Sequence, residues 1–255
     1  MDPNQLLDTV SYAGKLMIQS GAEIYRVEET MVRLCRSFEE VKDAESFVTP
    51  TGIMFSITIS NTTYTKILRV HSRGVDLNCI DQINDLSRRA TTQSFSNEEL
   101  ALELKEIAQG KRYSFPVILF FGALSAAGFA LFFEGSYLDG ICAFFIGIVI
   151  KLVSWLMEQR EFNSFFTNAI AAGMGAICAL LFHEIFKSTD VDIMIIASIM
   201  LLVPGLAITN ALRDSVAGDY LSGVARMTEA FLVAIAIAAG IGFVLSLSIG
   251  MNGGV

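Results

Sequence analysis

The sequence predicts an α+β domain over residues 1–114, followed by an all-α transmembrane bundle of five helices over residues 115–255. Three observations support this. Hydrophobic residues make up 53% of the chain and the mean hydropathy is +0.55, both high for a soluble domain. Of the 44 charged residues (18 basic and 26 acidic), 29 lie in the first 114 positions. The remainder contains five apolar stretches, each near the length that a bilayer requires.

Charge and cysteine content exclude several classes of function. The net charge is −8, and basic residues do not gather with aromatic ones, so nucleic acid is not expected as a partner. The four cysteines form no Cys-x-x-Cys pair and are expected to be free thiols. Because no P-loop, zinc-ligand spacing or nucleophile elbow occurs, we expect no cofactor, no metal site and no catalytic residue. The N-terminus lacks the pattern of a cleavable signal.

Two amphipathic helices are predicted to open the first domain, over residues 4–19 and from about residue 22 to residue 38. The second helix has apolar residues three and four positions apart on one face. Its other face carries Glu23, Arg26, Glu29 and Arg33 at i,i+3 and i,i+4 spacing. From spacing alone, this face is expected to be solvated, with ion pairs of about 0.2–0.5 kcal/mol each.

A small sheet is predicted next. Residues 53–60 alternate between apolar and polar side chains, which indicates a half-buried strand, and residues 63–70 form a plausible antiparallel partner. A loop of Thr49, Pro50, Thr51 and Gly52 precedes the first strand, and a short strand at residues 46–48 stays open. Two helices follow, one from about Asp76 and one from a capping box at residues 96–99. The expected order is ααββαα.

The predicted membrane spans cover residues 115–133, 137–156, 165–186, 193–209 and 227–249. The fourth is the shortest, and Pro204-Gly205 breaks it. Lys and Arg gather in the loops before the first span, between the second and third, and between the fourth and fifth. This bias predicts a multi-pass membrane protein with its N-terminal domain in the cytoplasm and its C-terminus outside.

The stretch of residues 204–226, PGLAITNALRDSVAGDYLSGVAR, gathers polar residues at a membrane edge, where they are costly unless paired. Asn210, Asp214 and Gly218 repeat every four residues on one helical face, and Arg213 lies on the adjoining edge. Pro204 lacks an N–H and frees a carbonyl one turn earlier. Two interpretations remain open: a discontinuous-helix transport site, or a kinked span whose Asp/Arg pairs only hold a loop.

Three segments resemble the threonine/serine exporter family: residues 204–226, SGAEIYRVEETMVRL near the N-terminus, and VTPTGIMFSI at the first predicted strand. Their order and the five spans cover nearly the whole chain, and the chain is most similar to the large subunit of the two-component type. The resemblance implies a non-enzymatic secondary transporter. It would export a small carboxylate-bearing metabolite (threonine, serine or succinate) across the bacterial cytoplasmic (inner) membrane, driven by an ion gradient for which H⁺ is expected.

The resemblance also carries candidate residues over by position. The substrate or coupling candidates are Asn210, Arg213, Asp214, Asp219 and Arg226. The helix-break and hinge candidates are Pro204, Gly205, Gly218 and Gly223, and the cytoplasmic-domain motif comprises Glu23, Arg26, Glu28, Thr49, Pro50, Thr51 and Gly52. We expect an arginine to pair with the substrate carboxylate, because a guanidinium suits that group. An aspartate would bind an amino group or carry the coupling proton.

In one respect the chain departs from the family pattern: full-length exporters have about twice as many spans. A small membrane subunit supplying the second half is therefore expected as a partner, with homo-oligomerisation as the other way to complete a pathway. The alternative function is a membrane-anchored ligand-sensing or regulatory subunit of a transport complex.

Overall fold

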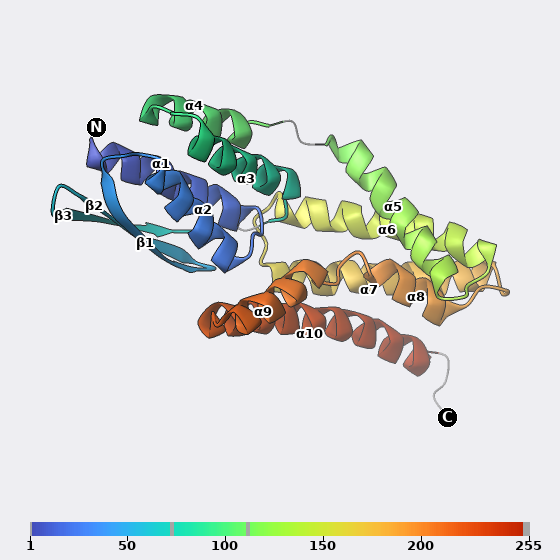
Figure 1. The fold of residues 1–255 in the computed structure, drawn as a ribbon. Coiled ribbons are helices and arrows are strands. Elements are labelled where there is room, and N and C mark those ends of the chain that lie inside the picture. The colour runs from blue at the N-terminus through green and yellow to red at the C-terminus, as the bar shows by residue number, and fades with distance from the viewer. Residues whose placement is uncertain (1, 72–73, 111–112, 252–255) are drawn as a thin grey trace. The chain divides into compact units, whose positions relative to one another are not determined.

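The computed structural model describes residues 2–71, 74–110 and 113–251 (Figure 1). The chain divides into two compact units. The first comprises Met1–Lys111 together with Leu206–Thr228, and the second comprises Arg112–Gly205 together with Glu229–Val255. The polar stretch near the C-terminus is thus grouped, from Leu206 on, with the N-terminal residues.

The first unit is built in three layers. The N-terminal part of this unit contains α1 (Pro3–Gln19), α2 (Ile24–Arg36), β1 (Val41–Thr49), β2 (Gly52–Ile59), β3 (Thr62–Arg69), α3 (Leu77–Thr92) and α4 (Asn97–Ala108). The antiparallel sheet has the order β1-β2-β3. Helices α1 and α2 pack on the sheet and also on the α3–α4 pair, so they form the middle layer (Figure 1).

The sheet has three strands where two were predicted, so the order is ααβββαα. The predicted alternation in β2 is confirmed, since Ile53, Phe55 and Ile57 are buried against the helices. The additional strand, β1, is nine residues long and contains the short strand that stayed open at residues 46–48; its remaining residues were not expected in a strand because its sequence, VKDAESFVT, is charged. It is an edge strand that buries only Ala44 and Val48, and charged side chains are common on edges because they oppose strand addition.

The helix ends of this unit follow the predicted signals. Asp76 caps α3 by accepting a hydrogen bond from the Cys79 N–H at 3.0 Å. The capping box at α4 is confirmed, with Ser96 and Glu99 each accepting from the other's backbone N–H. All four cysteines are free. Burial raises the pKa of Cys35 to about 12, which marks that thiol as a core residue rather than a reactive one.

The second unit is helical. It contains α5 (Phe115–Phe132), α6 (Tyr137–Glu158), α7 (Ser164–Ile185) and α8 (Val191–Ile199), together with most of α10 (Tyr220–Met251). Within the described residues, α5, α6, α7 and α10 are long and apolar enough to cross a membrane. These four helices agree with the first, second, third and fifth predicted spans.

The predicted fourth span, residues 193–209, is not a continuous helix. Helix α8 ends at Ile199, and α9 (Gly205–Ala217) begins directly after Pro204. Proline has no N–H to continue the helical ladder, and the preceding residue is disfavoured in the helical conformation. The nine residues of α8 extend only about 14 Å, against a hydrocarbon core of about 30 Å. The bundle of five transmembrane helices is therefore not confirmed, whereas the predicted break is.

Small residues bring the helices of the second unit together. A methyl group on Gly147 of α6 would lie 3.0 Å from Ala123 and Ala126 of α5. On α10 the tightest position is Gly240, where a methyl group would overlap the carbonyl oxygen of Ala169 on α7. The membrane helices thus pack through close backbone approach.

Candidate functional site

The polar stretch forms a helical hairpin made of α9 and the first turns of α10. Gly218 ends α9 with a φ of +99°, a conformation that glycine adopts without strain. The Asp219 N–H donates to the Asp214 carbonyl at 2.8 Å and the Gly218 N–H donates to the Ser215 carbonyl at 3.2 Å, which is a Schellman motif. Beyond the turn, a methyl group on Gly223 would lie 2.9 Å from the Ala211 carbonyl oxygen. Two of the predicted glycines therefore set the hairpin geometry.

A second Schellman turn joins α1 to α2. Gly21 has a φ of +89°, the Ala22 N–H donates to the Met17 carbonyl at 3.0 Å, and the Gly21 N–H donates to the Ile18 carbonyl at 3.1 Å. So tight a turn satisfies the end of α1 but leaves the Gly21 and Ala22 carbonyls and the first N–H of α2 in need of partners.

Helices α9 and α10 supply a side chain to each of the four residues 21–24. We call these four contacts the turn clamp. The Gly21 carbonyl accepts from Asn210 Nδ2 at 2.8 Å, the Ala22 carbonyl accepts from Arg226 Nη2 at 2.7 Å, Glu23 Oε1 accepts from Arg213 Nη1 at 2.5 Å, and the Ile24 N–H donates to Asp214 Oδ1 at 3.1 Å. Two segments about 190 residues apart are thereby joined within the first unit.

A buried ion pair lies at the centre of the turn clamp. Arg226 Nε is 3.0 Å from Asp214 Oδ2, and the two side chains are only 7% and 0% exposed. Burial raises the pKa of Asp214; the Ile24 N–H and Arg226 act against this rise, while Asp219 and Glu23 add to it, and the pKa remains above its ordinary value. Asp214 also faces the N-terminus of α2, where the helix dipole favours a negative charge.

Arg213 differs from Arg226 in its access to solvent. Its side chain is 56% exposed and pairs with Glu23, which also accepts from Arg26 Nε at 2.8 Å. Burial raises the pKa of Glu23, but its own backbone N–H and the guanidinium groups of Arg26 and Arg213 outweigh that effect, so the pKa lies below its ordinary value. An anion from solution can therefore reach Arg213, where it would compete with a charged Glu23, whereas Arg226 is covered.

Two further predicted carboxylates adjoin the turn clamp. Glu28 accepts a hydrogen bond from the Val48 N–H at 2.8 Å, which ties α2 to β1. Burial raises the pKa of Glu28, and the negative charges of Asp219 and Asp214 raise it further. The structure thus collects acidic groups near α2, yet across the described residues no cluster of three or more side chains suited to holding a metal ion occurs.

The predicted loop motif has a different location. Thr49, Pro50, Thr51 and Gly52 form the turn between β1 and β2, closed by a hydrogen bond from Thr49 Oγ1 to the Gly52 carbonyl at 3.3 Å. The Thr51 carbonyl accepts from the Val70 N–H at 3.0 Å. These contacts shape the sheet, whereas those of Glu23 and Arg213 belong to the turn clamp.

Gly21 and Ala22 lie within the family-like segment SGAEIYRVEETMVRL, but neither was named as a candidate site residue. Both act through backbone carbonyls, which no side-chain pattern reveals. The one available signal was the glycine between two helical patterns, which marks a helix C-terminus and hence a left-handed residue.

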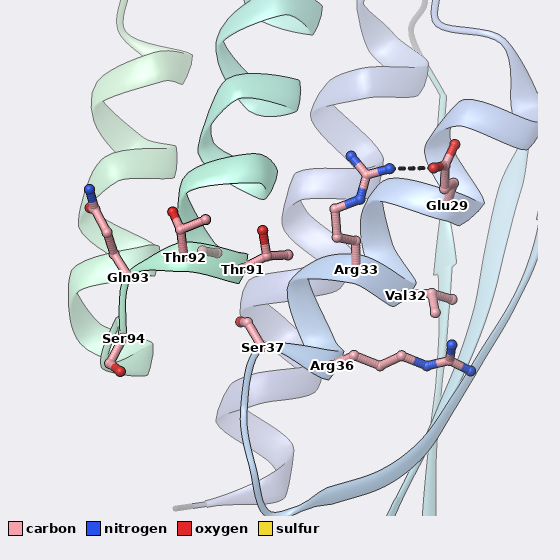
Figure 2. Close-up of a pocket in the computed structure, with 10 residues that line it drawn as sticks. Glu29, Val32, Arg33, Arg36, Ser37, Thr91, Thr92, Gln93 and Ser94 are labelled. Carbon is pink, nitrogen blue, oxygen red and sulfur yellow. Dashed lines mark hydrogen bonds and ion pairs between the residues drawn. The ribbon is translucent and has the colours of Figure 1, made fainter.

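A separate hollow of about 510 Å³ lies in the first unit between the C-terminal ends of α2 and α3 (Figure 2). In Figure 2 the Glu29–Arg33 ion pair lies along α2, and Thr91 and Thr92 lie across from it at the end of α3. Its lining comprises Glu29, Val32, Arg33, Arg36, Ser37, Ala90, Thr91, Thr92, Gln93 and Ser94. No motif predicted this hollow, because Glu29 and Arg33 alone indicate an ordinary solvated face.

Comparison with known proteins finds relatives that are named as exporters or transporter subunits. The model of the family ThrE, described as "Putative threonine/serine exporter", matches residues 8–248. The chain is 26% identical over 237 residues to "Probable succinate transporter subunit YjjP" of Escherichia coli K12, covering 92% of this chain and 91% of that protein. It is 22% identical over 242 residues to "Probable threonine/serine exporter" of Mycobacterium tuberculosis H37Rv, covering 93% of this chain but 45% of that protein. No solved structure matches.

Proposed function

Because the chain belongs to the threonine/serine exporter family, a family of membrane exporters, we propose that it is a secondary transporter exporting a small carboxylate-bearing metabolite. The observation that carries the proposal is the turn clamp. It joins the two most polar segments of the family resemblance, residues 21–28 and 210–226, into one site.

In this proposal Arg213 receives the substrate carboxylate. Its guanidinium is exposed and already paired with a carboxylate, that of Glu23, so the pair provides both the binding chemistry and a resident group to displace. Arg226 has another role: it is buried against Asp214 and the Ala22 carbonyl, and it holds the hairpin in position. Threonine, serine and succinate are the proposed substrates, from the names of the relatives.

Asp214 is the proposed carrier of the coupling proton. It is fully buried, its pKa is raised by burial, and it binds both the α2 N-terminus and Arg226. Protonation would remove the negative charge that the Ile24 N–H and Arg226 face, and because burial raises the pKa, the docked hairpin would bind this proton more readily than a hairpin released into water. Proton binding would thereby change the contacts beside Arg213.

The remaining parts of the proposal concern the membrane. We place the N-terminal residues in the bacterial cytoplasm, from the distribution of Lys and Arg in the loops. A small membrane subunit, a homo-oligomer or both would complete the pathway. The chain spans 45% of the length of the M. tuberculosis exporter, and the E. coli relative is named as a subunit, which supports this expectation.

Counterflow in reconstituted vesicles tests the function. The purified chain would be reconstituted with and without a candidate small membrane subunit. The vesicles would be preloaded with threonine, serine or succinate and given the same labelled compound outside. Accumulation of label for at least one substrate is expected. Failure of all three substrates in both preparations would contradict the proposal.

The hollow of Figure 2 favours a second candidate, ligand sensing by the first unit. Its Arg33 guanidinium suits a carboxylate, while Glu29 and the C-terminal ends of α2 and α3 favour an ammonium group. An α-amino acid matches both.

Equilibrium dialysis of the full chain with labelled threonine would test this. Arg33→Gln should abolish binding while Arg88→Gln, on exposed α3 surface, should not; equal binding by both variants would remove the hollow from consideration.

A further inference from the structure

Helix α9 has an apolar outer face, opposite to the face that forms the turn clamp. Ile208, Leu212 and Val216 recur every four residues, and the last two are 63% and 82% exposed. Asn210 and Asp214, on the other face, are buried. A helix on a water-facing surface shows the reverse arrangement, with its apolar side inward. The polarity of α9 is therefore inverted.

The apolar face continues across the hairpin turn. Leu221 and Val224, in the first turns of α10, are 75% and 64% exposed. They belong to the candidate membrane helix Tyr220–Gly250, whose 31 residues extend about 46 Å, longer than a hydrocarbon core of about 30 Å. Exposed Tyr220 stands at its start, an aromatic residue of the kind that gathers at membrane–water interfaces. The stripe thus includes the first turns of a helix that is long and apolar enough to cross a membrane.

We propose that the outer face of the α9–α10 hairpin, formed by Ile208, Leu212, Val216, Leu221 and Val224, lies against lipid acyl chains at one surface of the membrane. The side chains of the stripe are purely aliphatic, which suits acyl chains and offers no hydrogen bond or charge for a specific protein partner. On its inner face the turn clamp satisfies the polar groups, so the hairpin needs no water there.

With the stripe against lipid, Arg213 would lie at the boundary between acyl chains and headgroups. The residue directly follows Leu212 and is exposed, so its aliphatic stem can lie along the apolar surface while its guanidinium reaches the polar headgroup region. The turn clamp would then lie at the membrane surface. This inference concerns position in the membrane and stands whether or not the chain transports a substrate.

Fluorescence quenching by brominated lipid tests the position. Single-tryptophan variants of the full chain, Leu212→Trp, Val216→Trp and Leu221→Trp, would be made in a Trp155→Phe background and reconstituted with and without dibrominated phosphatidylcholine. The native protein, whose Trp155 lies on membrane helix α6, is the positive control. Gln93→Trp, on the exposed α3–α4 loop, is the aqueous control.

The expected result is a loss of fluorescence in brominated vesicles as large as that of Trp155, with little quenching by iodide. Quenching by iodide to the extent seen for Gln93→Trp would place the stripe in water and overturn the proposal. Protection from both quenchers would also overturn it, because protein would then cover the stripe. Using three exposed positions keeps the test intact if one variant fails to fold.

Discussion

Helix α2 carries charged residues at both ends, and the two ends are held in different ways. At the N-terminal end, Glu23 and the Ile24 N–H bind side chains about 190 residues away, around a fully buried Asp214. At the C-terminal end, Arg33 pairs with Glu29 one turn earlier, on the rim of an open hollow. Similar residue types thus form a tertiary lock at one end and a solvated ion pair at the other. Burial, rather than charge pattern, makes the difference.

The largest predicted contrast in stability comes from removing one arginine beside each end of α2. Arg226→Met leaves Asp214 buried without its counter-ion, which is expected to cost about 3–5 kcal/mol in the free energy of unfolding. Arg33→Met removes an exposed pair of about 0.3–0.5 kcal/mol. Chemical unfolding of both variants in the same detergent measures this contrast. Equal losses would mean that the turn clamp is not a tertiary lock.

A smaller effect is predicted for the close contact within the hairpin. Gly223→Val would force α10 away from the Ala211 carbonyl and the Ser215 hydroxyl, at a cost of about 1–3 kcal/mol. Gly242→Val, on the same helix but with open space around it, is the matched control and is expected to change the free energy of unfolding by less than about 0.5 kcal/mol. Thermal unfolding distinguishes the two; a harmless Gly223→Val would show that the hairpin is not tightly packed.

The pH dependence of stability is predicted to separate two neighbouring carboxylates. The folded-state pKa of Asp214 is raised above 3.8, so the folded chain binds more protons there than the unfolded chain. Proton binding at Asp214 therefore stabilises the fold at low pH, and this contribution is lost as the pH rises from 3.8 through the folded-state pKa. The folded-state pKa of Glu23 is lowered below 4.5, so its contribution is present above that pH and is lost as the pH falls through the folded value.

The two variants that remove these titrations are Asp214→Asn and Glu23→Gln. Relative to the native chain, Asp214→Asn should gain stability as the pH rises from about 4, and Glu23→Gln should lose it. Unfolding curves at several pH values, taken as differences from the native chain, give the two signs. The same sign for both variants would contradict the assignment of opposite environments.

The smallest effect is predicted at the rim of the hollow. Glu29→Gln removes the exposed pair with Arg33 and should cost about 0.3–0.5 kcal/mol at low salt, and less at high salt, because salt screens exposed charges. Unfolding at two salt concentrations measures it. A loss that does not depend on salt would indicate that this pair is more buried than its 60% exposed glutamate implies.

Much of the fold follows from periodicity. The alternation in β2, the capping box at Ser96 and four long apolar helices all repeat local patterns that single segments contain. Most of strand β1 shows no such pattern, because its exposed edge is charged. The interruption of the fourth span could be located at Pro204, but the span could not be recognised as two separate helices. Local patterns report burial on one face, and these two elements depend on their neighbours.

The candidate site was only partly accessible from sequence. Asn210, Asp214 and Gly218 could be placed on one face of a helix, but nothing in their spacing shows that Asp214 caps a helix near the other end of the chain. The separation of the two arginines into a buried Arg226 and an exposed Arg213 also required the folded contacts. Pairings that cross about 190 residues leave no periodic trace in a single sequence.

Counterflow and unfolding, measured together on one preparation of Arg213→Gln, test whether Arg213 receives the substrate. We expect the variant to lose counterflow for whichever of threonine, serine or succinate the native chain exchanges fastest. The free energy of unfolding is expected to stay within about 1 kcal/mol of that of the native chain, because the Arg213 side chain is 56% exposed and Glu23 keeps its ion pair with Arg26. Arg88→Gln, on the exposed surface of α3, should retain both properties. Native counterflow by Arg213→Gln would contradict the claim that this arginine receives the substrate.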